Sequence, residues 1–84
     1  MTSKAQITEW FNNSYVENAT NMAVFMDIMD HEDYPVYLVA SDTQDLRQKL
    51  NKKQDRLMEV YSYSVPLSDQ IDLPRCFNYK VNND

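Results

Sequence analysis

Pro35-Val36-Tyr37-Leu38-Val39-Ala40 is the stretch of sequence that decides the fold. It combines β-branched and aromatic residues without a charged position, so both faces of an extended segment are apolar. This composition predicts a buried strand. Its proline favours the edge of a sheet, because proline has no N–H to donate to a neighbouring strand.

A short helix is predicted upstream, over residues 4–12. Ser3 and Gln6 form the Ser-x-x-Gln pattern of a capping box, and Ile7, Trp10 and Phe11 then fall on one helical face.

A second, longer helix is predicted over residues 15–30, after a capping box from Ser14 to Glu17. The spacing of its apolar residues is four, three, four and three, and neighbouring residues widen the apolar face. We therefore expect this helix to be central to the core, with a strand as the alternative. The residues that set the spacing are Tyr15, Ala19, Met22, Met26 and Met29.

Downstream, Ser41-Asp42-Thr43-Gln44 predicts the start of a third helix, with Leu46 and Leu50 on its inner face and its end near Gln54. The alternation that follows predicts a strand over 56–65, with Leu57, Tyr61, Tyr63 and Val65 on one side and Met58, Val60, Ser62 and Ser64 on the other. A loop over 66–74 and a last strand over 76–81 complete the chain, before a polar tail from about residue 82.

These elements predict a single α+β domain over residues 1–84, in the order α, α, β, α, β, β. Three helices are expected on one face of a three-stranded sheet. The strand–helix–strand succession favours a parallel pair with a right-handed crossover, and the last strand is expected to pair antiparallel.

The sequence contains no glycine, and this absence excludes several classes of function. Phosphate-binding loops need glycine so that backbone N–H groups approach the phosphates, so the P-loop, the dinucleotide fingerprint and the kinase loop are excluded. Backbone positions with positive φ are expected to be asparagine or aspartate instead, with Asn12, Asn13, Asn51 and Asn82 as candidates.

The sequence contains few candidate residues for catalysis or metal binding. The one histidine, His31, lies in a charged turn with Asp30, Glu32 and Asp33, and the one cysteine, Cys76, has no second cysteine for a disulfide or a zinc motif. We expect a buried structural thiol, no metal, no cofactor, no small-molecule substrate and no enzymatic activity. The lone cysteine and the lack of a secretory leader or a membrane-spanning run predict a cytoplasmic protein.

Charge is unevenly distributed along the chain. Residues 1–46 carry eight acids and one base, residues 47–56 have a net charge of +4, and the net charge of the chain is −5. If the predicted second helix lies beside the start of the third, the acids form a negative face that attracts a basic groove. Tyr61 and Tyr63 are expected to add aromatic anchors from the sheet. The candidate partner-binding residues are Glu17, Asp27, Asp30, Glu32, Asp33, Asp42, Asp45, Tyr61 and Tyr63.

The basic residues suggest an alternative surface on the helix predicted over 43–54. Their spacing places most of them on one helical face, which can contact phosphates. A solvated helix face explains the same residues. The candidate nucleic-acid-binding residues are Arg47, Lys49, Lys52, Lys53 and Arg56.

In size and composition the chain resembles the small acidic antagonists that phages and mobile elements encode against host defence, of the anti-CRISPR and anti-restriction type. The resemblance implies a stoichiometric inhibitor that binds a host protein at a basic, nucleic-acid-handling surface. Two alternatives stay open: a self-associating structural or accessory subunit, with a homodimer as the assembly, and a weak nucleic-acid binder acting through the basic helix.

Overall fold

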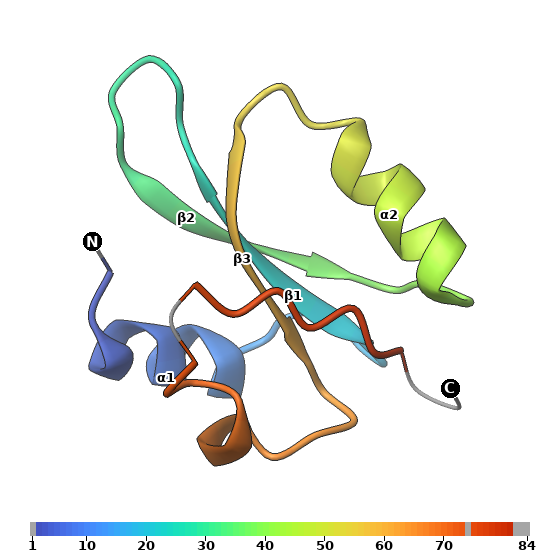
Figure 1. Ribbon diagram of the computed structural model, residues 1–84. Helices are drawn as coiled ribbons and strands as arrows, with labels where there is room; N and C mark the ends of the chain where they lie inside the picture. Colours follow the sequence, from blue (N-terminus) through green and yellow to red (C-terminus); the bar gives the residue numbers. More distant parts are fainter. Residues whose placement is uncertain (1, 74, 82–84) are drawn as a thin grey trace.

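A computed structural model describes residues 2–73 and 75–81 of the chain, which folds in the order α, β, β, α, β (Figure 1). The predicted α+β class is confirmed, whereas the predicted order α, α, β, α, β, β is wrong. The polar tail predicted from about residue 82 lies outside the described residues. The elements are α1 (Lys4–Asn12), β1 (Asn21–Met26), β2 (Asp33–Leu38), α2 (Thr43–Asn51), β3 (Arg56–Ser62) and a 3-10 turn, η1 (Leu67–Asp69).

The sheet has the order β2-β1-β3, and β1 pairs antiparallel with both of its neighbours. β2 and β3 therefore run in the same direction but are separated by β1, so the predicted pairing of adjacent parallel strands is wrong. Pro35 lies opposite Val24 on the edge strand β2. The predicted edge position of the proline strand is confirmed, and it is the position where a missing N–H is tolerated.

The helix predicted over 15–30 is replaced by an irregular segment and β1. Ser14 Oγ bonds both backbone groups of Val16, which makes a local turn in place of a helix cap. Asn18 has φ of 61°, a left-handed conformation that interrupts any right-handed helix. Met22 to Phe25 are fully buried between the neighbours of β1, and such an uninterrupted apolar run is typical of a strand with two covered faces.

A bulge in β3 changes the predicted side-chain alternation. Val24 pairs with Glu59 and Phe25 pairs with Leu57, so Met58 is the extra residue. A bulge of this kind puts two successive side chains on the same face of the sheet. Met58 and Glu59 consequently share the face that also carries Tyr61, and Leu57 lies on the opposite face. The strand ends at Ser62, before the predicted end at Val65.

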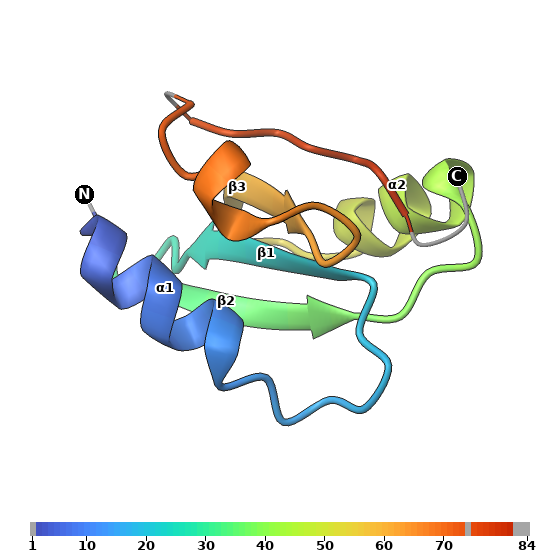
Figure 2. The ribbon, with the colours of Figure 1, turned by 90° about the horizontal axis from the view of Figure 1, so that it is seen from below.

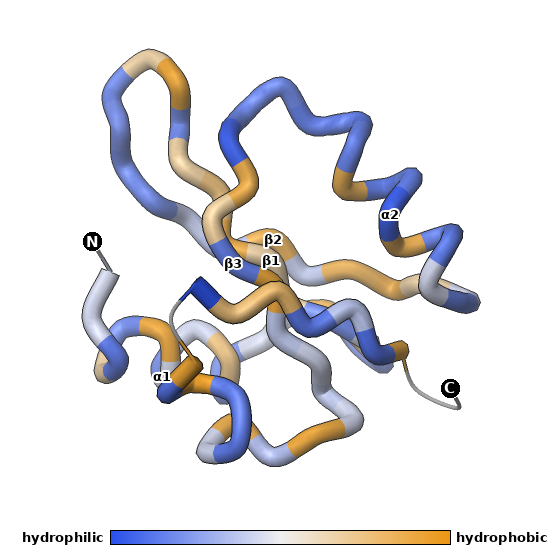
Figure 3. Tube along the Cα trace, viewed as in Figure 1, coloured by the Kyte–Doolittle hydropathy of each residue, from blue (hydrophilic) through white to orange (hydrophobic). Residues whose placement is uncertain are grey.

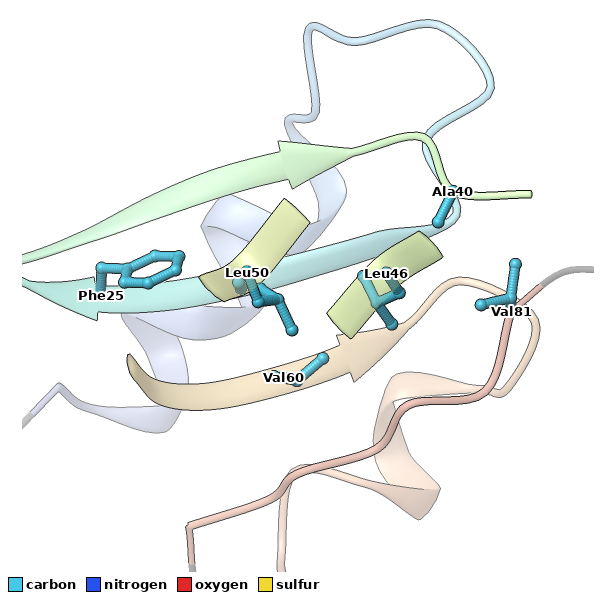
Figure 4. Packing of buried hydrophobic residues seen from close by; sticks show 7 residues of the cluster. Phe25, Ala40, Leu46, Leu50, Val60 and Val81 are labelled. Atoms are coloured by element: carbon cyan, nitrogen blue, oxygen red, sulfur yellow. The ribbon is translucent and has the colours of Figure 1, made fainter. Parts of the chain in front are cut away.

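The face of the sheet towards α2 holds one hydrophobic cluster (Figure 4). α2 contributes two side chains, Leu46 and Leu50, and the rest of its surface is hydrophilic (Figure 3). The cap of α2 lies in the predicted stretch Ser41 to Gln44 and is Asp42, but the helix ends at Asn51, before the predicted Gln54. The buried members of this cluster are Ala23, Phe25, Ala40, Leu46, Leu50, Val60 and Val81.

The opposite face holds a second cluster, covered by α1 and by the segment after β3 (Figures 1 and 2). α1 has its predicted bounds and its capping hydrogen bond from Gln6 N–H to Ser3 Oγ, at 3.1 Å. The predicted arrangement with all helices on one face is wrong, because β1 is apolar on both faces and each face needs its own cover. The buried members are Ile7, Met22, Val24, Tyr61 and Cys76.

The strand predicted over 76–81 is also wrong, since the described residues there make one isolated parallel bridge, between Phe77 and Val60. The Cys76 carbonyl and the Asn78 N–H bond the two backbone groups of Val60, at 2.7 and 2.9 Å. The chain then crosses the edge of β3, because Cys76 belongs to the α1-side cluster and Val81 to the α2-side cluster. This segment covers the outer edge of β3.

Three residues have positive φ in the described chain: Asn18, His31 and Arg75. The predicted sites at Asn12, Asn13 and Asn51 are wrong, and Asn82 lies outside the described residues.

Candidate functional site

The loop between β1 and β2, residues 27–32, is the most sharply defined exposed feature of the protein, and we call it the hairpin loop. The Asp27 carboxylate accepts hydrogen bonds from the N–H groups of Met29 and Asp30, at 2.7 and 3.4 Å. The Asp27 N–H donates to the Glu32 carbonyl and the His31 N–H donates to the Asp27 carbonyl, both at 2.8 Å. Side-chain acceptors of this kind order a turn without glycine.

Asp55, which precedes β3, fixes the hairpin loop from outside. One carboxylate oxygen accepts a hydrogen bond from the Ile28 N–H at 3.3 Å, and the other accepts the hydroxyl of Tyr34. The hydrogen bond to this carboxylate, together with burial, raises the pKa of the Tyr34 phenol to about 12. One carboxylate therefore connects the loop, β2 and the start of β3.

The hairpin loop exposes apolar side chains at its tip. Met29 is 86 % exposed and Ile28 is 51 % exposed, and Figure 3 shows a short hydrophobic stretch at the tip followed by hydrophilic residues. Asp30, Glu32 and Asp33 follow directly in the sequence. Apolar side chains on an ordered loop with charged neighbours resemble the anchors of protein interfaces.

The structure divides the predicted acidic residues into two groups. Asp27, Asp30, Glu32 and Asp33 lie in or next to the hairpin loop. Glu17, Asp42 and Asp45 lie beyond the opposite ends of β1 and β2, one strand length or roughly 17 Å away. The continuous acidic face expected from two adjacent helices is absent from the described residues, because residues 21–26 form a strand.

Two of the acids at that opposite end have structural roles in α2. Asp42 Oδ1 accepts the N–H of Asp45 at 2.8 Å, which caps the helix. Asp45 accepts the N–H of Ser41 at 2.9 Å and the ammonium group of Lys49 at 3.0 Å. These contacts hold the pKa of the Asp45 carboxyl below its ordinary value.

The two predicted tyrosine anchors differ in accessibility. Tyr61 is fully buried and donates its hydroxyl to Glu59 at 2.9 Å, so its ring does not reach the surface. Tyr63 is half-buried, stacks on Phe11 with 4.1 Å between ring centroids, and donates its hydroxyl to the Phe11 carbonyl. Both rings hold the sheet to α1.

The predicted basic surface is dispersed. Arg47 lies over the ring of Tyr79, 4.0 Å from its centroid, and Lys49 pairs with Asp45. Because α2 ends at Asn51, the remaining cations lie outside the helix, in the turn before β3 and at the first residue of β3, at the same end of the molecule as the hairpin loop (Figure 1). These cations are Lys52, Lys53 and Arg56.

Ile28, Met29 and Asp55 were missed by the sequence reasoning as site residues. The apolar spacing predicts Ile28 and Met29 at the end of a helix, whereas the two aspartates of the Asp-x-x-Asp stretch around them are the sequence signal of a turn. No local sequence pattern identifies Asp55, because its partners, Tyr34 and Ile28, precede it in the chain by 21 and 27 positions.

Within residues 2–73 and 75–81, no three histidine, cysteine, aspartate or glutamate side chains are grouped so that they can hold a metal ion. Cys76 is buried, as predicted, and burial raises the pKa of its thiol. None of the described helices is long and apolar enough to cross a membrane. No family model, curated protein or solved structure matches the chain.

Proposed function

We propose that the protein is a non-catalytic, cytoplasmic inhibitor that inserts its hairpin loop into a basic, nucleic-acid-handling site of a host enzyme or defence complex. The observation that carries this proposal is the exposure of Ile28 and Met29 on a loop whose backbone is held by Asp27 and Asp55. A loop ordered before binding loses little conformational entropy when it binds, which favours affinity.

The side chains of the hairpin loop suggest which kind of surface the partner presents. Met29 is a flexible, polarizable side chain suited to an apolar pocket, and the carboxylates of Asp30, Glu32 and Asp33 suit a basic rim around that pocket. A groove that binds nucleic acid offers both, since it contacts bases through apolar surfaces and phosphates through cations. The proposed anchor is thus apolar at its centre and acidic around it.

Lys52 and Lys53 in the turn before β3, and Arg56 at the start of β3, make one side of this end of the molecule basic. A basic partner is attracted to the hairpin-loop side and repelled on the side of the turn, which fixes the orientation of approach. The proposed binding surface is therefore the hairpin-loop side of this end of the molecule, and not the side of the basic turn.

The test is affinity capture of the tagged full-length chain from its host cells, with and without nuclease, followed by mass spectrometry. We expect a nucleic-acid-handling protein that stays bound after nuclease treatment. Met29→Ser and Asp30→Lys should each weaken binding to the captured partner at least about ten-fold, because interface anchors carry most of the binding energy. Raising the salt concentration should weaken binding further.

Matched controls lie at the opposite end of the sheet. Val39 is 47 % exposed and Asp69 is exposed in η1, so Val39→Ser and Asp69→Lys change the same chemistry away from the hairpin loop. Equal weakening by these variants, or a partner lost on nuclease treatment, would contradict the proposal. The second result would instead favour binding of nucleic acid.

A second candidate, self-association, is favoured by the outer edge of β2, with which no described strand pairs. Exposed edges can pair with a second chain, although a proline in the strand opposes this. Analytical ultracentrifugation over a range of concentrations decides: a dimer supports this candidate, and a monomer throughout excludes it.

A further inference from the structure

Two cavities adjoin each other on the α1 side of the sheet, with volumes of about 570 and 540 Å³. They share three lining residues, Thr2, Asp33 and Met58, and together form what we call the α1 groove. At one end the groove reaches His31 and Glu32 of the hairpin loop, and at the other it reaches the segment around Leu73 and Arg75. The α1 groove is therefore continuous with the surface proposed above.

The carboxylate of Glu59, a residue of β3, lies in the wall of this groove. Glu59 shares the α1 face of the sheet with Tyr61 by strand alternation, and the bulge brings Met58 to the same face. Its Oε2 accepts the hydroxyl of the buried Tyr61 at 2.9 Å. Among the described residues, no lysine, arginine or histidine nitrogen lies close enough to this carboxylate to form an ion pair. Glu59 is thus half-buried and makes no ion pair within the described part of the chain.

Apolar side chains of Ile7, Met58 and Ile71 line the same cavity as Glu59, together with charged side chains. A carboxylate removed from water costs free energy unless a cation compensates it. A lysine or arginine side chain suits such a site, because its methylene stem packs on apolar surface while its charged end reaches an anion.

The remaining charges along the groove also favour a cation. Glu32, Asp33, Glu59 and Asp72 line it, against Lys4 and Arg75, and the ammonium group of Lys4 is already paired with Asp72. This excess of carboxylates repels an acidic ligand and attracts a basic one.

We propose that an extended segment of the partner protein lies in the α1 groove and places a lysine or arginine side chain against Glu59, with neighbouring apolar side chains on Met58 and Ile71. This inference rests on the proposed protein-binding function and adds a second contact to it. The hairpin loop and the groove then bind adjacent parts of one basic partner.

The test uses the full-length chain with labelled methionine and isoleucine methyl groups, titrated with a blocked hexapeptide of alternating lysine and leucine. We expect saturable NMR shifts at the methyl groups of Ile7, Met58 and Ile71. Glu59→Gln keeps an acceptor for Tyr61 and removes the charge, and we expect it to weaken peptide binding at least about ten-fold. Glu9→Gln, an exposed carboxylate on α1, is the matched control and should bind as the parent does.

A peptide with norleucine in place of lysine tests the cation itself, because norleucine keeps the aliphatic stem. Its binding should be as weak as that of the lysine peptide to Glu59→Gln. Equal affinity of both peptides, equal affinity of Glu59→Gln and the parent chain, or shifts outside the groove would each overturn the inference.

The hairpin-loop variants separate this inference from the proposed function. Met29→Ser should lose the captured partner and still bind the lysine peptide in the groove. If partner capture depends on Met29 while the lysine peptide does not bind, the groove inference fails and the proposed function stands. If the peptide binds as expected and capture is insensitive to Met29, the proposed function of the loop fails.

Discussion

The carboxamide of Gln70 makes hydrogen bonds to both backbone groups of Ser62, 2.7 Å from the Ser62 nitrogen to Oε1 and 2.8 Å from Nε2 to the Ser62 oxygen. The side chain thereby occupies the place of a neighbouring strand at the end of β3. Gln70 is buried, and its amide also bonds the Val65 carbonyl and the side chain of Asn78. One amide thus holds the segment after β3 against the sheet.

Gln70→Ala should lower the free energy of unfolding by about 2–4 kcal/mol, because it leaves the buried N–H of Ser62 and the amide of Asn78 without acceptors. Urea denaturation measures this change. Gln48→Ala, on the exposed side of α2, is the control and should change stability by less than about 0.5 kcal/mol. A similar small effect at Gln70 would show that this amide does not support the fold.

Leu46→Ala should cost about 2–5 kcal/mol, since Leu46 is fully buried and α2 is attached to the sheet by two leucines. The variant should also lose protection from hydrogen exchange in α2 before the rest of the sheet. Leu73→Ala removes the same atoms from a side chain that is 54 % exposed, and its cost should be well below that of Leu46→Ala. Equal costs would contradict the packing described for α2.

The stability of the protein should fall at alkaline pH through Tyr34. Its pKa is about 12 in the folded chain, against an ordinary value near 10, so the folded state holds the phenol proton more tightly than the unfolded state does. This contribution is complete below about pH 10 and is lost as pH rises towards about 12. Unfolding measured across this range should show a less steep decline in Tyr34→Phe. An unchanged decline would mean that the Asp55 contact is not kept in solution.

The thiol of Cys76 should react slowly in the folded protein. The side chain is 2 % exposed, and burial raises the pKa of the thiol, which reduces the thiolate that reacts with disulfide reagents. Reaction with a colorimetric disulfide reagent should accelerate strongly in denaturant, in proportion to the unfolded fraction. Prompt reaction under native conditions would place Cys76 at the surface.

Local chemistry was sufficient for several elements of the fold. The capping box at Ser3 predicted α1 with its bounds, the stretch from Ser41 to Gln44 predicted the start of α2, and Pro35 predicted an edge strand. Each of these depends on contacts between residues a few positions apart, or on a backbone property of one residue, so the sequence contains the needed information.

The candidate site was predictable only in part. The acids around His31 were recognised as a turn, but the anchor residues Ile28 and Met29 were assigned to a helix that does not form. The apolar residues of β1, which precede them, fit a helix and a buried strand equally well, because the run is short. Only the pairing of β1 with two strands selects the strand.

By itself, the sequence determined the α+β class and the beginnings of both helices, and its lack of glycine excluded the glycine-dependent phosphate loops. These features follow from composition and from short-range hydrogen bonds. Tertiary structure decided that β1 is the central strand, that the helices cover opposite faces, and that Asp55 fixes the hairpin loop. It also decided that a bulge brings Met58 to the α1 face, where Met58 and Glu59 line a groove. These features depend on backbone pairing and side-chain packing between distant segments. The free energy gained from these contacts is larger than the free energy by which local propensity favours a helix.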